Sequence, residues 1–269
     1  MTTEDRRPEV QWRRLRAEQL RAAARDDAVV ILPLGSLEQH GPHLPIEVDS
    51  TLGEQVALRI AMRMTEAGTP TLVLPMVWTG VSEHHMSFGG TVTLELSAYV
   101  ALVEGIVRSV LRHGFRRVVL LNGHGGNENA LRSIVDDLTP RLGVPIVQFC
   151  YWHAAAEAIA AILETQTALL HACEAETSMM MACADELVAR DRIALAKVNQ
   201  TPDVSDVVGG GVYMWRAIGS RSGSGVIGNP EAASTGKGMR LFDAISAVLA
   251  EKLGSAELWG LPWNAEKLT

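Results

Sequence analysis

Short apolar runs alternate, along the first 150 residues, with longer stretches in which apolar residues recur every three or four positions. The short runs of five to seven residues are 28–34, 71–77, 117–121 and 145–149. Their length and branched side chains are typical of buried strands, and the stretches between them have helical spacing. Strands that alternate with helices of about 15 residues predict right-handed crossovers and a mostly parallel sheet. We therefore expect an α/β fold, specifically a three-layer α/β/α sandwich.

Helical spacing accounts for most of the remaining sequence. Helices are predicted over 12–25, from Asp49 or Ser50 to Gly68, from Leu96 to Gly114, from about Asn127, and over 154–163, 174–190 and 234–253. A segment rich in Gly and Ser, 209–228, precedes the last helix. No repeat, linker or low-complexity boundary divides the sequence, so we expect a single domain over residues 1–269.

Composition and charge narrow the functional classes. The chain has 24 basic and 31 acidic residues, a formal net charge of −7, and no basic stripe. Nucleic acid is therefore not an expected partner. The apolar runs are shorter than the roughly 18 residues that a membrane span needs, and no secretory signal is recognised, so no membrane is expected. Three cysteines in apolar surroundings are typical of reduced thiols, and these features together predict a cytoplasmic protein.

The candidate chemistry begins directly after the first predicted strand. Glu38 and His40 are two residues apart, on one side of an extended segment, and Asp49 follows them. Because the carboxyl ends of parallel strands share one edge of a sheet, His124 after the third strand is expected nearby. Carboxylates and imidazoles together suit Zn²⁺, Mn²⁺ or Fe²⁺, and Asp49 is the candidate bridge between two ions. The alternative is that these side chains are loop residues bonded to backbone.

Two further clusters have structural alternatives of their own. Glycines on both sides of His124 permit close approach of backbone or substrate, but a tight turn with an incidental histidine is an equal alternative. His171 precedes Glu174 and Glu176 at a predicted helix start, where acids also stabilise the helix dipole without any chemistry. The histidine beside these two acids favours a functional interpretation.

Three segments resemble the signature blocks of the creatininase family of metal-dependent amidohydrolases. They are GSLEQHGPHLP at 35–45 with Asp49 behind it, NGHGGN at 122–127, and HACEAETS at 171–178. The resemblance runs from about residue 10 to residue 255, with the blocks in the family's order. It implies two divalent metal ions, Zn²⁺ or Mn²⁺ with Fe²⁺ also suited, and a homohexamer built from dimers.

The resemblance also implies ligand roles. Glu38 and His124 would bind one ion, His40 would bind the other, and Asp49 would bridge them. Creatininase has a further glutamate ligand two residues after the signature histidine, where this chain has Gly126. The site would therefore lack one carboxylate unless the third block supplies it.

The third block carries the remaining roles. Glu174 is expected to take the missing ligand position, and Glu176 matches the catalytic acid. His171 matches the histidine that polarises the substrate or relays a proton. The division of roles between Glu174 and Glu176 stays open at this point.

Residues that surround creatinine in creatininase mostly differ in this chain. Gly125 stands where creatininase has a tyrosine, and Thr167 and Ala168 stand where it has an aromatic residue followed by Asp. Trp152 does match an aromatic residue that covers the creatinine pocket. We expect substrate contacts from Gly125, Trp152 and His84. His84 and His85 would either contact substrate or support the metal ligands, although each is equally well explained as a surface loop residue.

The expected activity is hydrolysis of a C–N amide bond in a small cyclic or linear amide. A metal-activated water would attack the carbonyl, and Glu176 would pass a proton to the leaving nitrogen. One alternative is a family member that acts on a formamide-type substrate or a small modified peptide. Another is a non-catalytic, metal-bound oligomeric protein. The glycine-rich segments 209–211 and 219–228 would form either a lid or a plain surface loop.

Overall fold

The structure is a computed structural model that describes residues 8–196 and 212–260. Within these residues four parallel strands form a sheet in the order β2-β1-β3-β4. The strands are β1 (Val29–Leu34), β2 (Thr71–Val73), β3 (Arg117–Asn122) and β4 (Ile146–Cys150). β1 is buried along its whole length, as a strand covered on both faces requires.

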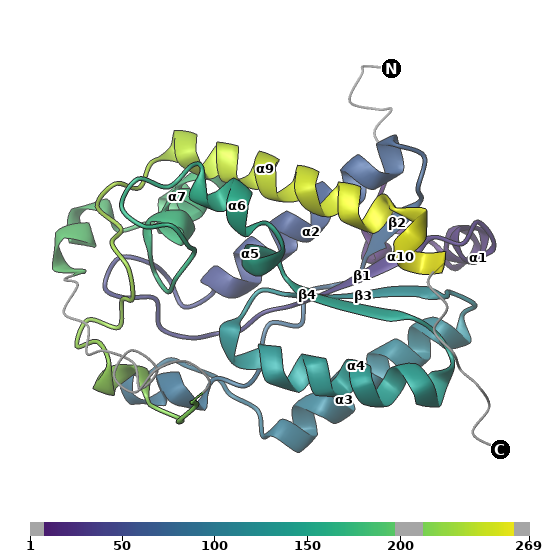
Figure 1. Cartoon of the computed structure of the whole chain (residues 1–269), viewed down its shortest axis with the longest axis horizontal. Helices are drawn as coiled ribbons and strands as arrows, with labels where there is room; N and C mark the ends of the chain where they lie inside the picture. The colour runs from purple at the N-terminus through teal and green to yellow at the C-terminus, as the bar shows by residue number, and fades with distance from the viewer. Residues whose placement is uncertain (1–7, 197–211, 261–269) are drawn as a thin grey trace.

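Helices cover both faces of the sheet, so the predicted α/β/α sandwich is confirmed (Figure 1). One layer contains α2 (Val48–Glu66), α5 (Tyr151–Ala154), α6 (Ala156–Ala160), α7 (Glu174–Cys183) and α9 (Thr235–Gly254). The opposite layer contains α3 (Leu96–Arg112) and α4 (Glu128–Leu142). Alternate residues of β1 enter different cores: Ile31 packs with the α2 side, and Leu32 packs with the α3 side.

The described residues form eight further elements. They are η2 (Trp12–Arg14), α1 (Ala17–Arg25), η3 (Glu83–Phe88), η4 (Gly125–Asn127), η5 (Asp185–Leu187), η6 (Arg190–Leu195), η7 (Ile218–Ser220) and α10 (Ala256–Gly260). None of the described helices is long and apolar enough to cross a membrane. The three cysteines are free, as the sequence predicts.

The strand register brings the segments that follow β1 and β3 together. Leu34 pairs with Asn122 at the carboxyl ends of the two strands. The next residue on the β3 side, Gly123, donates its N–H to the carbonyl of Leu34 at 2.8 Å. The two polar segments therefore leave the sheet side by side, as expected for neighbouring parallel strands.

Several predicted elements are shorter than their apolar patterns. β2 stops at Val73, although the N–H of Leu74 still donates to the carbonyl of Ile31 at 2.9 Å. Beyond it the register with β1 shifts by one residue, so Val77 makes only an isolated bridge with Leu34. The helix predicted over 154–163 begins earlier and is divided at Ala155.

The helices predicted over 12–25 and 174–190 are also shorter than their patterns. The extended backbone of Arg16 separates η2 from α1, and the helix predicted over 174–190 ends at Cys183, where Ala184 leaves helical geometry. The helix predicted at 234–253 is confirmed as α9, and the side chain of Ser234 caps it.

Candidate metal centre

The loop after β1 holds Glu38 and His40 in a buried position at the end of the sheet. The N–H of Glu38 donates to the carbonyl of Ile46 at 2.9 Å, and His40 forms a bridge with Leu44. The hydroxyl of Ser36 donates to Glu38 Oε2 at 3.0 Å. Both Glu38 and His40 are at most 1% exposed, so their polar atoms need partners inside the protein.

Asp49 reaches the same point from the first turn of α2. The start of this helix approaches β1 very closely: a Cβ at Gly35 would lie 2.7 to 2.9 Å from three atoms of Ser50. Only glycine at the end of β1 permits this approach. The hydroxyl of Ser50 donates to the carbonyl of Ser36 at 3.0 Å and fixes the helix start against the loop.

His124 arrives from the end of β3. Asn122 fixes this turn, because its side chain accepts from the N–H of His124 at 3.1 Å and donates to the His124 carbonyl at 2.7 Å. Nδ1 of His124 lies 3.1 Å from Glu38 Oε2 and 3.0 Å from Asp49 Oδ2. These three side chains form the first cluster of candidate ligands.

A second cluster shares Asp49 with the first. His40 Nε2 lies 3.2 Å from Asp49 Oδ1 and 3.9 Å from Glu176 Oε2. The two oxygens of Asp49 thus face different clusters, one toward His124 and the other toward His40. This division is the arrangement that a carboxylate bridging two ions requires.

The third signature block sends Glu176, not Glu174, to this centre. Ala172, with a φ of 53°, directs its N–H onto Glu176 Oε2 and orients that carboxylate. Glu174 lies instead in a separate buried network: Lys237 Nζ donates to it at 2.6 Å, and the N–H of Thr165 donates at 2.8 Å. The structure does not bring Glu174 to the candidate ligands, because residues two apart on a helix point in different directions.

Burial and neighbouring charges shift the pKa values of the cluster. Burial raises the pKa of Glu176 to about 8, although the nearby His40 lowers it. Burial opposes protonation of His40, but Asp49 and Glu176 raise its pKa to about 9. The pKa of His124 lies well above its usual value despite burial, because Glu38 and Asp49 flank it. In the absence of metal, the protons on His40 and His124 therefore supply positive charge that compensates the neighbouring carboxylates.

The donor set fits a pair of divalent ions. Within the described part of the chain, His40 Nε2 and Asp49 Oδ2 are buried and make no hydrogen bond, although each lies close to an oppositely charged group. Buried polar atoms without hydrogen bonds are costly, and a bound cation would satisfy both. The mixed oxygen and nitrogen ligands suit Zn²⁺, Mn²⁺ or Fe²⁺.

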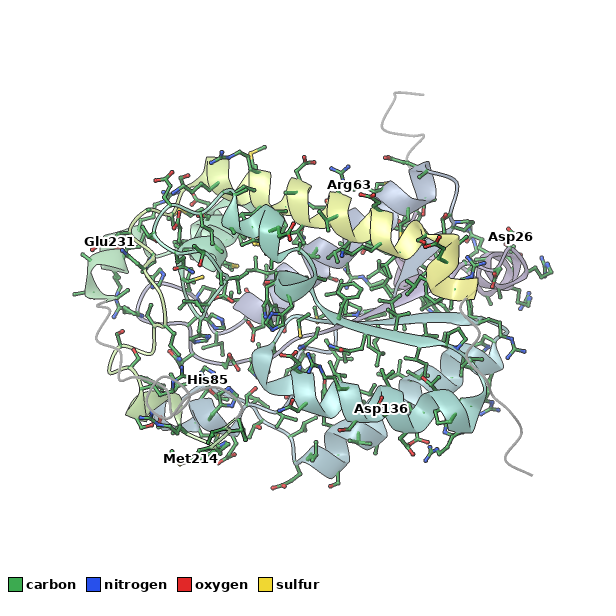
Figure 2. The ribbon with its side chains drawn as sticks, viewed as in Figure 1. Asp26, Arg63, His85, Asp136, Met214 and Glu231 are labelled. Atoms are coloured by element: carbon green, nitrogen blue, oxygen red, sulfur yellow. The ribbon has the colours of Figure 1, made fainter. Side chains whose placement is uncertain are left out.

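A glutamine organises the histidines around this centre. Gln39 Nε2 lies 3.0 Å from His85 Nδ1 and 2.9 Å from His171 Nε2. An amide nitrogen only donates, so His85 accepts at Nδ1 and carries its proton on Nε2, which lies 3.1 Å from Glu38 Oε1. His85, labelled in Figure 2, thereby orients a candidate ligand from η3. Gln39 Nε2 has two hydrogens, which it donates to His85 and to the Gly225 carbonyl at 3.1 Å. His171 Nε2 lies 2.8 Å from the carbonyl of Gln39 and donates to it, so its 2.9 Å approach to Gln39 Nε2 is a contact and not a hydrogen bond.

A cavity of about 240 Å³ opens over the centre. Its lining contains each of the residues expected to contact substrate: His84, Gly125 and Trp152. Ile218, Arg221 and Ile227 also line the cavity, so the part of the predicted lid that follows Ile218 borders it. The other part, 209–211, lies outside the described residues.

Gly126 has a structural reason to be glycine. A Cβ at this position would overlap with the carbonyl of Val81 and the ring of His124, and would lie 2.7 Å from His84. The ring of His84 stacks on that of His124 with 5.5 Å between centroids. Gly126 stands where creatininase is expected to have its glutamate ligand, and in this chain His84 fills the space beside that position.

Three contributors were not singled out from the sequence. Gln39 stands between two candidate ligands and points to the other side of the segment, so spacing alone assigns it no role. Ser36 is an ordinary turn residue in sequence. Arg221 could have been noticed in the sequence, because it is a charged residue inside a segment rich in Gly and Ser.

The sequence of this chain is similar to those of a known amidohydrolase and of a known peptidase. The family model for creatininase, described as creatinine amidohydrolase, matches residues 13–253. The mycofactocin precursor peptide peptidase of Mycobacterium ulcerans is 31% identical over 217 residues, which are 79% of this chain and 79% of that protein. The creatinine amidohydrolase of Pseudomonas putida is 32% identical over 201 residues, 69% of this chain and 74% of that protein.

A more distant relative shares part of the chain. The 2-amino-5-formylamino-6-ribosylaminopyrimidin-4(3H)-one 5'-monophosphate deformylase of Methanothermobacter marburgensis is 34% identical over 125 residues, which are 44% of this chain and 49% of that protein. The shared part is less than half of each protein. It therefore supports common ancestry more than a common substrate.

Solved structures give the same result. A crystal structure of creatinine amidohydrolase (creatininase) has a TM-score of 0.76 at 26% identity and covers 91% of this chain and 96% of that chain. A manganese form of creatininase has a TM-score of 0.75 at 25% identity, covering 91% and 98%. A Zn-Zn form of a creatininase mutant has a TM-score of 0.75 at 26% identity, covering 91% and 97%. The chain therefore belongs to the creatininase family.

Proposed function

We propose that this protein is an amidohydrolase that works with two divalent metal ions. The observation that carries this proposal is the position of Asp49, whose two oxygens face two separate ligand clusters. Glu38 and His124 would hold one ion together with Asp49. His40 and Glu176 would hold the other, so Glu176 takes the ligand role first expected of Glu174.

Zn²⁺ and Mn²⁺ are the ions that we propose, and Fe²⁺ suits the same ligands. Creatininase structures in manganese and zinc forms support the first two. Bound ions of this kind polarise a carbonyl oxygen and make a bound water more acidic. The protein contributes a rigid, buried ligand set and a cavity that limits access of bulk water.

His171 is the residue that we propose to move a proton. Its Nε2–H is engaged by the carbonyl of Gln39, so in the neutral ring Nδ1 is the nitrogen free to accept a proton. Nδ1 lies 3.7 Å from Glu38 Oε1, and His171 borders the cavity. Burial, and then the charge of His40, keep the pKa of His171 well below its usual value, so the ring is neutral at pH 7. A neutral imidazole there can take a proton and return it to a leaving nitrogen.

A small amide is the substrate class supported by the cavity. Its volume of about 240 Å³ admits only small molecules or the end of a short chain. Trp152 offers an aromatic face, and Gly125 leaves open space where creatininase has a side chain. Creatinine is one candidate, whereas a small modified peptide is a second candidate, favoured by the similarity to a peptide peptidase over 79% of the chain. A formamide-type substrate is a third.

The remaining parts of the proposal concern the whole protein. We propose a single cytoplasmic domain that assembles as a homo-oligomer, with a hexamer as the expected form in this family. Size-exclusion chromatography with light scattering tests the assembly. No nucleic acid partner is included, since the net charge is −7.

A substrate panel tests the activity. Protein stripped with chelator and refilled with Mn²⁺ or Zn²⁺ is incubated with creatinine, a formylated aminopyrimidine and short peptide amides. Hydrolysis of at least one amide that disappears on chelation and returns on refilling is the expected result. Full metal binding without hydrolysis of any of them would favour a non-catalytic, metal-bound protein instead.

A further inference from the structure

One wall of the cavity is formed by a segment that packs firmly on the metal centre. η7 packs against η3, and a Cβ at Gly219 would lie 2.9 Å from the hydroxyl of Ser87. Further along, Gln39 Nε2 donates to the carbonyl of Gly225 at 3.1 Å. The N–H of Ile227 donates to the carbonyl of His171 at 2.9 Å. These contacts anchor the wall at three points beside the centre.

Arg221 lies on this wall at the end of η7. Its N–H donates to the carbonyl of Ile218 at 2.8 Å, which closes the turn, and its side chain lines the cavity. Arg221 is the one lysine or arginine among the described residues of the lining.

The charge balance of the cavity favours an anion. The carboxylates at its floor come from Glu38, Asp49 and Glu176, and three negative charges do not neutralise two divalent ions. With two divalent ions and a neutral bound water, the centre therefore keeps one positive charge, and Arg221 places a guanidinium group in the wall. In a confined cavity with apolar neighbours such as Trp152, charges of this kind act strongly on a ligand. Guanidinium groups match carboxylate and phosphate oxygens with paired hydrogen bonds.

We infer that Arg221 determines substrate specificity by binding an oxyanion group, carboxylate or phosphate, carried by the amide substrate. The inference rests on the proposed function, because it places the scissile amide at the metal centre. It adds that the substrate is an anionic amide whose charged group lies on the side of His84 and η7. A neutral amide of the same shape would lack this contact.

Three ligands that share a benzamide group test the inference by calorimetry. They are hippurate, which has a carboxylate; N-benzoylaminomethylphosphonate, which has a phosphonate; and hippuramide, which is uncharged. Dissociation constants are measured on protein refilled with Mn²⁺. At least one of the two anions is expected to bind about tenfold or more tightly than hippuramide, since a hydrogen bond to a charged group has this value. The stronger anion distinguishes a carboxylate from a phosphate substrate.

Variants separate Arg221 from the metal as the origin of this preference. Arg221→Gln is expected to reduce the preference to less than threefold, and Arg221→Lys to keep part of it. Arg216→Gln removes a charge from the same segment outside the cavity lining and is expected to keep the full preference. A preference that survives Arg221→Gln, equal binding of all three ligands by the natural protein, or no binding of any would overturn the inference.

The binding result is independent of catalysis. If the anion preference depends on Arg221 while no amide is hydrolysed, the proposed function fails and the anion site stands. If amides are hydrolysed but the anion preference does not depend on Arg221, the anion site fails and the proposed function stands.

Discussion

The carboxylate of Glu174 lies 2.6 Å from the ammonium group of Lys237, and both side chains are buried. The same carboxylate accepts from the N–H groups of Glu164 and Thr165 and from the Thr165 hydroxyl. It therefore joins α7 and α9 to the segment that leads to His171. An acid with the sequence context of a metal ligand is here a structural residue.

Replacing Glu174 is expected to reduce stability without removing metal. Glu174→Gln leaves Lys237 as a buried, poorly compensated charge, which typically costs about 3–5 kcal/mol. Urea unfolding of the metal-free protein measures the change. Glu164→Gln is the matched control, because its carboxylate also pairs with Lys237 but is 67% exposed, and its cost is expected to stay below about 1 kcal/mol. Equal losses in the two variants would contradict the assignment.

The same ion pair predicts a pH range for its stabilising effect. Burial opposes the charge of Glu174, but Lys237 and Thr165 lower its pKa below the ordinary 4.5, so its contribution is full above pH 4.5 and is lost as acid protonates it. Bonds to Glu174 and Glu164 raise the pKa of Lys237 above 10.5 despite desolvation, so its contribution is lost only as the pH rises through that raised pKa. The difference in unfolding free energy between natural protein and Glu174→Gln should stay constant from pH 5 to 9 and shrink below pH 4.5.

Metal counts distinguish the two acids of α7. Glu176→Gln is expected to lower the content from about two ions per chain to about one, because only the cluster with His40 loses a ligand. Asp49→Asn should weaken both sites. Glu174→Gln should retain two ions. Elemental analysis after refilling with Mn²⁺ or Zn²⁺ gives the counts, and a loss of metal in Glu174→Gln alone would reverse the assignment.

Metal binding is expected to release protons. In the metal-free protein, Glu176 with a pKa of about 8 and His40 with a pKa of about 9 are both protonated at pH 7. The cation that these two residues hold must displace both protons, so its apparent affinity should rise about ten- to a hundredfold per pH unit from pH 6 to 8. Calorimetry in two buffers with different ionisation enthalpies counts the protons. Glu176→Gln should release about one fewer.

Two adjacent glycines make a matched pair of substitutions. Gly126→Ala adds a Cβ that overlaps with Val81 and His124, and is expected to cost about 1–3 kcal/mol and to weaken metal binding. Gly125→Ala points its Cβ into open space and should leave stability nearly unchanged. Gly126→Glu should not create the ligand that creatininase has, because His84 and His124 already fill the approach. A gain of metal affinity in that variant would show that the loop can rearrange.

The sequence predicted the sheet and the first ligand cluster for the same reason. Polar residues that follow neighbouring parallel strands meet at one edge, and this rule brings Glu38 and Asp49 to His124. The second strand was overestimated because apolar character continues past Val73, whereas the register with β1 shifts by one residue before Val77.

The choice between Glu174 and Glu176 depends on tertiary contacts that spacing does not contain. Both acids lie in the first turn of α7, and both are buried. Lys237, which belongs to α9, selects Glu174, while the backbone of Ala172 turns Glu176 toward the centre. The same limit applies to Gln39, whose partners come from three separate parts of the chain.

The bond from the Ile227 N–H to the His171 carbonyl has a consequence for how the cavity fluctuates. It is a backbone contact between the wall that carries Arg221 and the segment that carries the proposed proton carrier. The amide hydrogen of Ile227 exchanges with solvent only when these two segments separate. The exchange rate of this amide therefore measures how often the cavity opens, and a small molecule that binds in the cavity should lower that rate.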